Sequence, residues 1–580
     1  MDEWIENIVE LESNIESYPN PGIKVFQYGT SGIRYNSEHL DHVLHRMGLL
    51  VALRSIHLKS AAVGLMITAS HNPRDDNGIK LIDPLGEMLD SSWEVYATKL
   101  ANAHNNQDVC AMLINIAYEN NIDKKYIPRV YIGRDTRNSG KRLLDAVLCG
   151  VKAFNSNVED FGIITTPMLH FFVRCYNTNG LYGQPSEHSY YTKLTNSFKT
   201  LRKMASKLHT YLIDKNIFAC LDLKNYSPVI EFDGANGVGA LKMKDAIIHL
   251  EETLVINMHN DDIMNTEKLN YKCGADFVKS NQCPPTGMTI KPYSKYVSVD
   301  GDADRIVYSF VDENNKFYLL DGDRIATLVA GYIKDLFIAS GLDVNVGLVQ
   351  TAYSNGNSTK YVTDKLITYY KILLLAIVYV LQKVPVACVP TGVKYLHHKA
   401  NDYDVGIYFE ANGHGTILFK DAIRELIRYQ CSIEVEEAKS LALKKLICIM
   451  DMTNETVGDA YSDMLIVESV LCERGWSISD WYKTYSDLPN RLKQVTVKDR
   501  NTFETGDAER ICLKPLGLQE KINSIVLKYS MGRSFVRPSG TEDVVRIYAE
   551  ADTQTNADKL AVEVATAVYD IADGVGKRPE

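Results

Sequence analysis

The segment Val297-Ser-Val-Asp-Gly-Asp-Ala-Asp-Arg305 joins a short apolar run to a turn that carries three aspartates. Asp300, Asp302 and Asp304 are spaced at i, i+2 and i+4, and the glycine between them lets the chain bend, so their carboxylates can converge on a small hard cation. An EF-hand calcium loop is the competing interpretation, but Val311 stands where that loop needs a bidentate glutamate. A solvated acidic turn is the simpler alternative. The arginine that follows favours a magnesium site, because it could reach a bound phosphoryl group.

Other short apolar runs also lead into polar or glycine-containing turns, and they alternate with amphipathic stretches. This alternation predicts βαβ units and parallel sheets, whose ligands bind beyond the carboxyl ends of the strands. The C-terminal part differs: two runs flank a tight turn and an amphipathic helix follows at about 557–571, which predicts a smaller α+β unit. The predicted strands are Gly64–Thr68, Arg129–Ile132, Val229–Phe232, Val346–Val349, Val384–Ala387, Ser534–Val536 and Val544–Tyr548.

The length and composition of the chain limit the classes of protein to which it can belong. The chain has 580 residues, and at roughly 150 residues per domain this predicts about four domains. Apolar residues make up 45% and charged residues 23%, which is typical of a folded chain. The net charge of -10 argues against a general nucleic-acid binder, so a phosphate site must be a local positive cluster.

The cysteines and the termini indicate the compartment. The eleven cysteines are scattered without a C-x-x-C pair, which favours reduced thiols over disulfides or a zinc site. The first residues lack the features of a signal peptide. The longest apolar block, Ile372–Leu381, is shorter than the ~20 residues of a membrane span. We therefore expect a cytoplasmic protein without a membrane partner.

A second candidate site is Thr68-Ala-Ser-His-Asn-Pro73, which follows a predicted strand. A serine in this position, here Ser70, can act as a nucleophile or phosphoryl carrier if a metal offsets the charge. An ordinary turn is the alternative from composition alone. A Ser-His-Asp hydrolase is also conceivable, yet the chain contains no G-x-S-x-G elbow.

Two further segments carry polar groups suited to a phosphosugar. Arg537-Pro-Ser-Gly-Thr-Glu542, with Arg546 beyond it, could hold a phosphate, although a hairpin turn with surface arginines fits equally well. Phe409-Glu-Ala-Asn-Gly-His-Gly-Thr416 offers donors and acceptors for sugar hydroxyls, while a structural role is the alternative for its histidine.

Together, and in this order, these four segments resemble the α-D-phosphohexomutase superfamily. The Glu-Ala-Asn-Gly-His version of the sugar loop resembles the branch that acts on N-acetylglucosamine phosphates. Two departures are an apolar insertion between Tyr361 and Pro385, and Ser31 in place of a frequent alanine. The resemblance runs from about residue 26 nearly to the C-terminus and includes Phe26–Arg34, Ile132–Arg137, Thr165–Pro167, Leu169–His170, Asp233–Gly237, Cys273–Lys279, Leu320–Arg324, Thr391–His398 and Leu488–Arg491.

The resemblance implies an α/β fold with three mixed-sheet domains of similar topology and a smaller C-terminal α+β domain around a central cleft. The implied domains are 1–190 with the phosphoserine loop, 191–311 with the metal-binding loop, 312–460 with the sugar-binding loop and 461–580 with the phosphate-binding loop.

The resemblance also implies roles for individual residues. Ser70 matches a phosphorylated serine, and a Ser70 phosphate oxygen would join Asp300, Asp302 and Asp304 around Mg²⁺. The other catalytic candidates are Arg34, His71, Lys80, Arg305 and His414. The substrate-binding candidates are Thr391, Gly392, Glu410, Asn412, Arg537, Ser539, Gly540, Thr541 and Arg546.

The implied reaction interconverts N-acetylglucosamine 6-phosphate and N-acetylglucosamine 1-phosphate through phosphoserine and a 1,6-bisphosphate, in the biosynthesis of UDP-N-acetylglucosamine. Mg²⁺ and a hexose or N-acetylglucosamine 1,6-bisphosphate activator are the implied cofactors. The implied partner is a small phosphosugar, without nucleic acid or an obligate protein partner. The alternatives are a phosphoglucomutase or phosphomannomutase of the same superfamily, a metal-dependent sugar phosphatase that uses Ser70, and a silent sugar-phosphate-binding protein.

Overall fold

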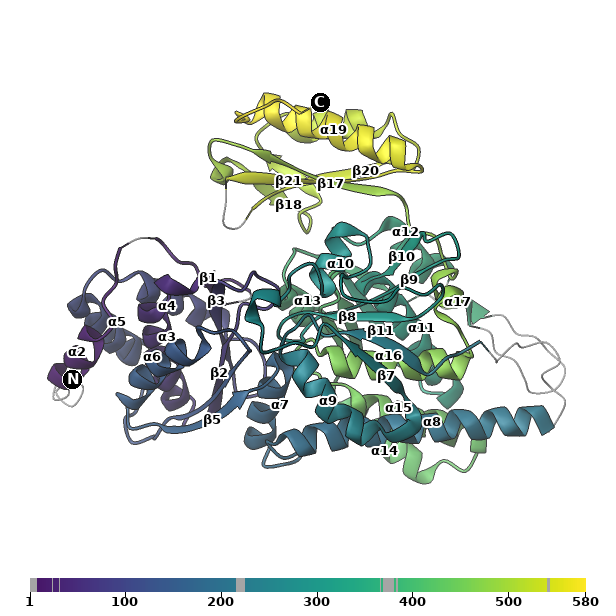
Figure 1. The fold of residues 1–580 in the computed structure, drawn as a ribbon, viewed down its shortest axis with the longest axis horizontal. Coiled ribbons are helices and arrows are strands. Elements are labelled where there is room, and N and C mark those ends of the chain that lie inside the picture. Colours follow the sequence, from purple (N-terminus) through teal and green to yellow (C-terminus); the bar gives the residue numbers. More distant parts are fainter. Residues whose placement is uncertain are drawn as a thin grey trace. The chain divides into compact units, whose positions relative to one another are not determined.

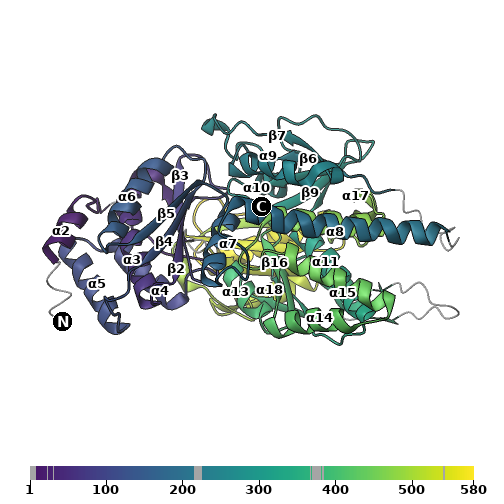
Figure 2. The ribbon, with the colours of Figure 1, turned by 90° about the horizontal axis from the view of Figure 1, so that it is seen from below.

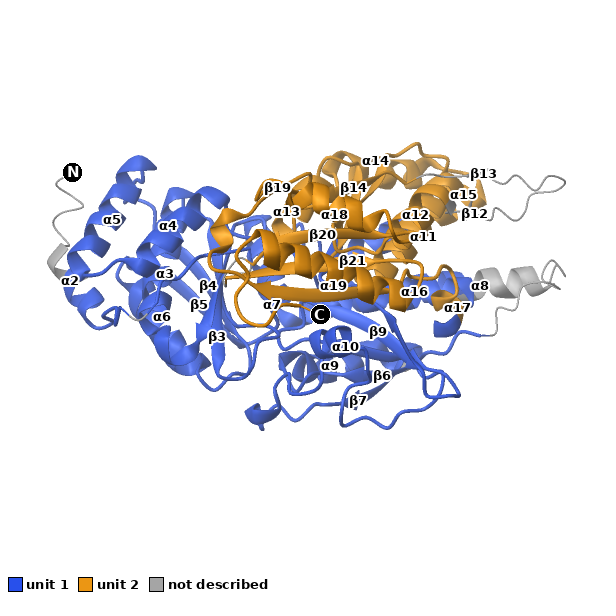
Figure 3. Ribbon diagram, turned by 90° about the horizontal axis from the view of Figure 1, so that it is seen from above, with its two compact units in different colours: residues 1–321, 412–416, 444–479 blue, residues 322–411, 417–443, 480–580 orange. Residues whose placement is uncertain are grey.

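The chain forms two compact units (Figure 3). Residues 1–321, 412–416 and 444–479 form the first unit, and residues 322–411, 417–443 and 480–580 form the second. The computed structural model describes residues 8–22, 24–30, 32–214, 225–365, 367–368, 380–381, 384–539 and 543–579. Ser31 and most of the apolar block Ile372–Leu381 lie outside the described residues. The end of that block, β13 (Val380–Leu381), pairs antiparallel with β12 (Ile367–Thr368).

The N-terminal sheet of the first unit has the strand order β1 (Ile33–Asn36), β3 (Asp76–Ile82), β2 (Ala62–Ile67), β4 (Arg129–Arg134), β5 (Asn157–Ile163) (Figure 1). It is mixed, because β2, β4 and β5 are parallel while β3 runs antiparallel to β1 and β2. Its helices are α2 (Ile8–Glu16), η1 (Ser37–His39), α3 (Asp41–His57), α4 (Ser91–Asn102), α5 (Asn106–Glu119), α6 (Gly140–Lys152) and α7 (Thr166–Asn177).

The central strand β2 is apolar throughout because helices cover both of its faces. Val63 and Leu65 belong to the core formed with α3 and α6, whereas Gly64 faces Val173 of α7. Successive side chains of a strand point to opposite faces, so a strand buried on both sides reads as a continuous apolar run.

The second sheet of this unit has the order β10 (Phe317–Leu320), β9 (Ile306–Val311), β8 (Tyr296–Val299), β6 (Val229–Asp233), β7 (Val255–His259). It is also mixed: β6 is parallel to β7 and β8, and β9 is antiparallel to β8 and β10. The long helix α8 (Figure 2) crosses this region. It packs against α9 and α16. The helices of this region are α8 (Glu187–Asp214), α9 (Val238–Leu250), η2 (Glu251–Thr253), η3 (Thr266–Lys268), α10 (Ala275–Asn281) and α16 (Ala460–Arg474).

The larger sheet of the second unit has the order β14 (Val386–Val389), β11 (Val346–Thr351), β15 (Val405–Phe409), β16 (Gly415–Phe419), with β11 parallel to both neighbours. Its central strands β11 and β15 are buried and pack against α11 and α13. The helices of this region are α11 (Gly322–Ser340), α12 (Gly356–Lys360), the π-helix η4 (Tyr361–Lys365), α13 (Val393–Ala400), α14 (Asp421–Ile433), α15 (Glu437–Met452) and α17 (Ile478–Tyr482).

The C-terminal region is a three-stranded antiparallel sheet covered by α19 on one face (Figure 1). Val536 and Ile547 face α19, whereas Phe535 and Tyr548 point the other way and pack against Ala352, which follows β11. The elements are β17 (Asn490–Thr496), η5 (Arg500–Thr502), the hairpin β18 (Glu504–Gly506) and β19 (Ile511–Lys514), α18 (Leu518–Val526), β20 (Arg533–Pro538), β21 (Val544–Glu550) and α19 (Gln554–Ile571).

These sheets confirm the predicted α/β class with a smaller C-terminal α+β part. The two sheets of the first unit are mixed, whereas the alternation along the sequence alone predicted parallel sheets. The division into four domains stays a prediction, and β10 completes the second sheet although it follows residue 311. Among the described helices, none combines the length and the apolar character needed to cross a bilayer.

Candidate active site

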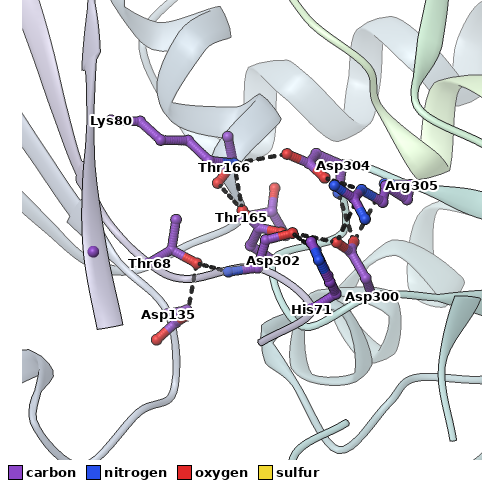
Figure 4. Close-up of polar contacts among 12 residues, drawn as sticks. Thr68, His71, Lys80, Asp135, Thr165, Thr166, Asp300, Asp302, Asp304 and Arg305 are labelled. Atoms are coloured by element: carbon purple, nitrogen blue, oxygen red, sulfur yellow. Dashed lines mark hydrogen bonds and ion pairs between the residues drawn. The ribbon is translucent and has the colours of Figure 1, made fainter. Parts of the chain in front are cut away.

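The candidate active site lies in the first unit, where the turn after β2 meets the turn after β8 (Figure 4). Ser70 follows β2 and Asp300 follows β8, and both side chains are buried. The Ser70 hydroxyl donates a hydrogen bond of 2.6 Å to Oδ2 of Asp300. The strand ends of two different sheets therefore bring together the predicted nucleophile and the predicted metal ligands.

The backbone of Ser70 is in the left-handed region, with φ +52°. For a residue with a side chain this conformation costs roughly 1–2 kcal/mol, so neighbouring contacts must hold it. One such contact is local: the Ser70 amide donates to Oγ1 of Thr68 at 2.9 Å, and the Thr68 hydroxyl donates to Asp135 at 2.7 Å.

Two side chains clamp the Ser70 turn through the same two backbone carbonyls. Nη2 of Arg137 donates to the carbonyl oxygens of Ser70 and Asn72 at 3.0 and 2.9 Å. Nδ2 of Asn270, in the loop after η3, donates to the same two carbonyls at 2.9 and 3.2 Å. Arg137 is itself held by Asp135, at 3.0 Å from its Nε. The turn is thus fixed by residues associated with both sheets.

Lys80 and the start of α7 complete the surroundings of the aspartates. Nζ of Lys80, on β3, lies 2.8 Å from Asp302 Oδ2 and 2.7 Å from Asp304 Oδ2. The Thr166 hydroxyl donates to Asp302 Oδ2 at 2.6 Å, and its amide donates to the Asp302 carbonyl at 3.2 Å. Helix α7 begins here because Thr165 caps it and a proline occupies its first turn. The positive end of a helix dipole therefore contacts the acidic cluster.

The three aspartates fit a divalent cation. One oxygen from each of Asp300, Asp302 and Asp304 lies within 4.8 Å of the others, and all three residues are buried. Oδ1 of Asp302 is buried and has no hydrogen-bond partner among the described residues. A buried oxygen of this kind is costly unless something else satisfies it. Carboxylate and hydroxyl oxygens are the ligands that Mg²⁺ prefers.

The charges of the cluster are unevenly compensated. Burial and then repulsion from the two neighbouring carboxylates raise the pKa of Asp300 well above its usual range. Burial would also raise the pKa of Asp304, but attraction to Lys80 and His414 outweighs it and holds that pKa well below its usual range. Asp300, which accepts the Ser70 hydrogen bond, is therefore the carboxylate whose charge would gain most from a bound cation.

The other predicted catalytic residues surround the same point. Nε of Arg305 lies 3.8 Å from Asp300 Oδ2. Burial and then repulsion from Arg305 lower the pKa of Arg34 on β1. Nδ1 of His71 lies 3.3 Å from Ser70 Oγ, and burial followed by nearby arginine charges holds the pKa of His71 far below its ordinary value. The His71 ring is therefore neutral at physiological pH.

His414 reaches the cluster from a tight loop. Its Nδ1 lies 3.4 Å from Asp304 Oδ1, and its amide donates to Oδ1 of Asn412 at 3.0 Å. Gly413 has φ +87° and packs so closely against the carbonyl of Ile306 that a side chain would not fit. The loop is thus fixed beside the acidic turn, and two of its predicted site residues, Asn412 and His414, belong to the first unit.

The remaining substrate-binding candidates belong to the second unit. There, Thr391 and Arg537 meet through Glu509: the Thr391 amide and hydroxyl donate to Glu509 Oε2 at 2.9 and 2.6 Å, and Arg537 Nε donates to Oε1 at 2.9 Å. Gly540 and Thr541 lie outside the described residues. The described candidates of this unit are Thr391, Gly392, Glu410, Arg537, Ser539 and Arg546.

Among the residues that contact the predicted sites without a role assigned from the sequence are Thr166, Arg137, Asn270 and Glu509. Thr166 and Arg137 stand in segments that resemble the superfamily, so a signal for them was present. Asn270 and Glu509 stand in polar loops, where nothing in the local pattern indicates what their side chains contact. All four form hydrogen bonds with backbone groups or with the side chains of other site residues.

Family models match most of the chain. Two describe the phosphoacetylglucosamine mutase AMG1: domain II matches residues 205–307 and domain III matches residues 321–476. Two describe phosphoglucomutase/phosphomannomutase: the alpha/beta/alpha domain I matches residues 49–108 and 99–184, and the C-terminal domain matches residues 492–567.

Full-length relatives are similar over nearly the whole chain. The phosphoacetylglucosamine mutase of Sus scrofa is 47% identical over 564 residues, covering 97% of both chains. The phosphoacetylglucosamine mutase of Candida albicans is 41% identical over 575 residues, covering 96% of this chain and 99% of the relative.

Solved structures share the fold. The Aspergillus fumigatus N-acetylphosphoglucosamine mutase in complex with GlcNAc-6P and magnesium has a TM-score of 0.87 at 43% identity, covering 97% of this chain and 99% of the other. A serine-to-alanine variant of the Aspergillus fumigatus enzyme in complex with glucose 1,6-bisphosphate has a TM-score of 0.86 at 42% identity, with the same coverage.

Proposed function

The chain belongs to the phosphoacetylglucosamine mutase family, and from this premise we propose that it interconverts N-acetylglucosamine 6-phosphate and N-acetylglucosamine 1-phosphate. The observation that carries the proposal is the hydrogen bond of 2.6 Å between Ser70 and Asp300 inside a buried cluster of three carboxylates. A hydroxyl in such a place can accept and return a phosphoryl group.

The proposed metal ligands are Asp300, Asp302 and Asp304, together with an oxygen on Ser70. Mg²⁺ bound by these groups would offset the negative charge of the phosphoryl oxygens during transfer. The orphaned Asp302 Oδ1 and the uncompensated charge of Asp300 support this assignment.

In the forward half-reaction, the phosphorylated Ser70 transfers its phosphoryl group to the free sugar hydroxyl. The bond between Ser70 Oγ and phosphorus breaks, a bond between the sugar oxygen and phosphorus forms, and the hydroxyl proton leaves. Arg34, Lys80 and Arg305 are the proposed stabilisers of the transferring oxygens. His71 and His414 are the proposed proton carriers, because both lie beside the cluster and could take up the hydroxyl proton and return it to the Ser70 oxygen.

The resulting 1,6-bisphosphate turns end for end, and Ser70 then takes the other phosphoryl group. The hydrogen bond to Asp300 orients the Ser70 hydroxyl for this step. The clamp on the Ser70 turn keeps the oxygen in place in both half-reactions, since a displacement of about 1 Å can reduce the rate about 100-fold.

The substrate must be held in two orientations. The proposed contacts of the sugar are Glu410, Asn412, Thr391 and Gly392. Because a few versatile donors and acceptors suit either orientation, they fit this task better than a tight apolar pocket. The proposed contacts of the phosphate that is not reacting are Arg537, Ser539, Gly540, Thr541 and Arg546.

The proposal includes a hexose or N-acetylglucosamine 1,6-bisphosphate as activator, which restores phospho-Ser70 after loss of its phosphate. Residues for every step lie in this chain, so no obligate protein partner is part of the proposal. We further propose a cytoplasmic location, which is supported by free thiols at all the described cysteines.

Two measurements test this function together. Mass spectrometry of the purified protein should find one phosphate on the peptide that contains Ser70. Turnover of the N-acetylglucosamine, glucose and mannose 1-phosphate/6-phosphate pairs should be fastest with the N-acetylated pair. Faster turnover of another pair would favour a phosphoglucomutase or phosphomannomutase, and net release of inorganic phosphate without isomer formation would favour a phosphatase.

A further inference from the structure

The tip of the β18–β19 hairpin has an unusual backbone. Asp507, Ala508 and Glu509 are consecutive and lie in the left-handed region, with φ of +48°, +55° and +67°. Three such residues without a glycine are strained, and strain of this kind persists only where other contacts hold it. Arg510 supplies some of them, donating from Nε to the Asp507 carbonyl at 3.1 Å and from Nη2 to its carboxylate at 2.6 Å.

The strained tip presents the Glu509 carboxylate to two predicted substrate-binding residues. One oxygen of this carboxylate accepts hydrogen bonds from both the amide and the hydroxyl of Thr391, at 2.9 and 2.6 Å. The other oxygen accepts a hydrogen bond from Nε of Arg537 at 2.9 Å. The side chain of Glu509 is only 14% exposed and that of Arg537 only 21%. A single carboxylate thus joins the loop before α13 to the end of β20.

Arg537 needs such an anion for a second reason. In the register of β20 and β21 it lies directly opposite Arg546, so two guanidinium groups occupy neighbouring positions on one face of the sheet. Like charges placed directly opposite each other on antiparallel strands are destabilising. Glu509 offsets this repulsion through its hydrogen bond with Nε of Arg537.

We propose that Glu509 is a positioning residue for substrate binding, which fixes Thr391 and Arg537 in one preassembled arrangement. The inference rests on the proposed function, in which Thr391 contacts the sugar and Arg537 contacts the phosphate that is not reacting. Glu509 acts through these two residues, so its loss weakens the binding of both phosphosugars while the chemistry at Ser70 continues.

The test compares Glu509→Gln with Glu504→Gln. A glutamine has one acceptor oxygen, so it can serve Thr391 or Arg537 but not both. Glu504 stands on the same hairpin and pairs with Lys514 at the surface, 2.7 Å away, without a contact to either site residue. Glu504→Gln therefore removes the same charge from the same hairpin and is the matched control.

Initial rates are measured with N-acetylglucosamine 1-phosphate and 6-phosphate, and thermal midpoints report folding. We expect Glu509→Gln to raise KM for both substrates about tenfold, the value of one lost charged hydrogen bond, with a much smaller change in kcat. The control should match the wild type. An unchanged KM overturns the inference, and a lowered KM overturns it too, because Glu509 would then compete with the substrate phosphate.

Arg537→Ala separates this inference from the function on which it rests. If Arg537→Ala raises KM and Glu509→Gln does not, the phosphate site stands and only the role of Glu509 is wrong. If Arg537→Ala also leaves KM unchanged, the proposed phosphate site itself fails. If both variants raise KM, the double variant should be little worse than Arg537→Ala alone, since Glu509 acts partly through Arg537.

Discussion

Ser70 Oγ lies 2.6 Å from Asp300 Oδ2, although 230 positions separate the two residues in the sequence. The contact joins the turn after β2 of one sheet to the turn after β8 of another, and Asn270, in the loop after η3, adds a second contact to the Ser70 turn through the Ser70 carbonyl. A phosphoryl group on Ser70 would therefore arrive among the aspartates, Lys80 and Arg305. Most of the transfer chemistry depends on stabilising charge at this one point.

The first prediction concerns the covalent carrier. Ser70→Ala removes the oxygen that accepts the phosphoryl group, so we expect mutase activity to fall to background and the phosphate on the Ser70 peptide to disappear. Intact-mass and peptide-mass measurements check the phosphate, and a coupled assay checks the activity. Ser524→Ala on the exposed surface of α18 is the control and should behave as wild type. Undiminished activity of Ser70→Ala would exclude the covalent mechanism.

The second prediction concerns the acidic cluster and does not depend on activity. Asp300→Asn removes one of three mutually repelling buried carboxylates, so the metal-free protein should become more stable. The same change removes a metal ligand, so added Mg²⁺ should no longer raise the thermal midpoint as it does in the wild type. Asp262→Asn, which breaks an exposed pair with Lys268, is the control and should keep the Mg²⁺ response. An equal Mg²⁺ shift in all three proteins would contradict the assigned metal site.

The sequence predicted the active-site turns because their chemistry is local. Three aspartates at alternating positions after an apolar run indicate a metal site before any contact is known, and Ser70 follows another such run. Their meeting in space was predicted from a resemblance, since spacing along the chain carries no information about which turns meet. In the structure the hydroxyl of Ser70 in one turn donates a hydrogen bond to Asp300 in the other.

The supporting residues could not be predicted for a physical reason. Asn270 contacts two backbone carbonyls and Glu509 contacts Thr391 and Arg537, and many polar residues in loops could make such contacts. Which polar residue makes the contact depends on how the loop that carries it packs against another part of the fold. The left-handed backbone at Ser70 and Glu509 is likewise visible only in the structure, because neither position carries the glycine that usually marks it.

The third prediction tests the clamp on the Ser70 turn. Asn270→Asp keeps the size of the side chain and tolerates the φ of +56° at this position, but replaces the amide donor by an acceptor facing two carbonyls. We expect kcat to fall about tenfold or more, with a smaller change in KM, because the position of Ser70 Oγ matters most in the transition state. Asn281→Asp, an exposed residue of α10, is the control. A change in KM alone would show that Asn270 acts on substrate binding and not on Ser70.

The fourth prediction is the dependence of stability on pH. Burial lowers the pKa of His170 from 6.5 to about 4, although the hydrogen bond of 2.7 Å with the Gly86 carbonyl acts in the opposite direction. Between these two values the unfolded chain binds more protons than the folded chain, so the free energy of unfolding falls as the pH is lowered from about 6.5 to 4, by up to about 3 kcal/mol for this residue. Below about pH 4, His170 is protonated in both the folded and the unfolded chain, so it no longer changes the free energy of unfolding as the pH falls.

Urea unfolding midpoints measured across this range for the wild type and His170→Gln check the prediction. The variant should lose less stability on acidification than the wild type, because glutamine does not titrate. Part of the dependence should remain, since burial also lowers the pKa values of His42 and His45 to about 4. His104→Gln, at an exposed position, is the control and should follow the wild-type curve. Parallel curves for the wild type and His170→Gln would contradict the prediction. They would mean that protonation of His170 does not oppose folding, and that its burial is not the cause of the loss of stability at low pH.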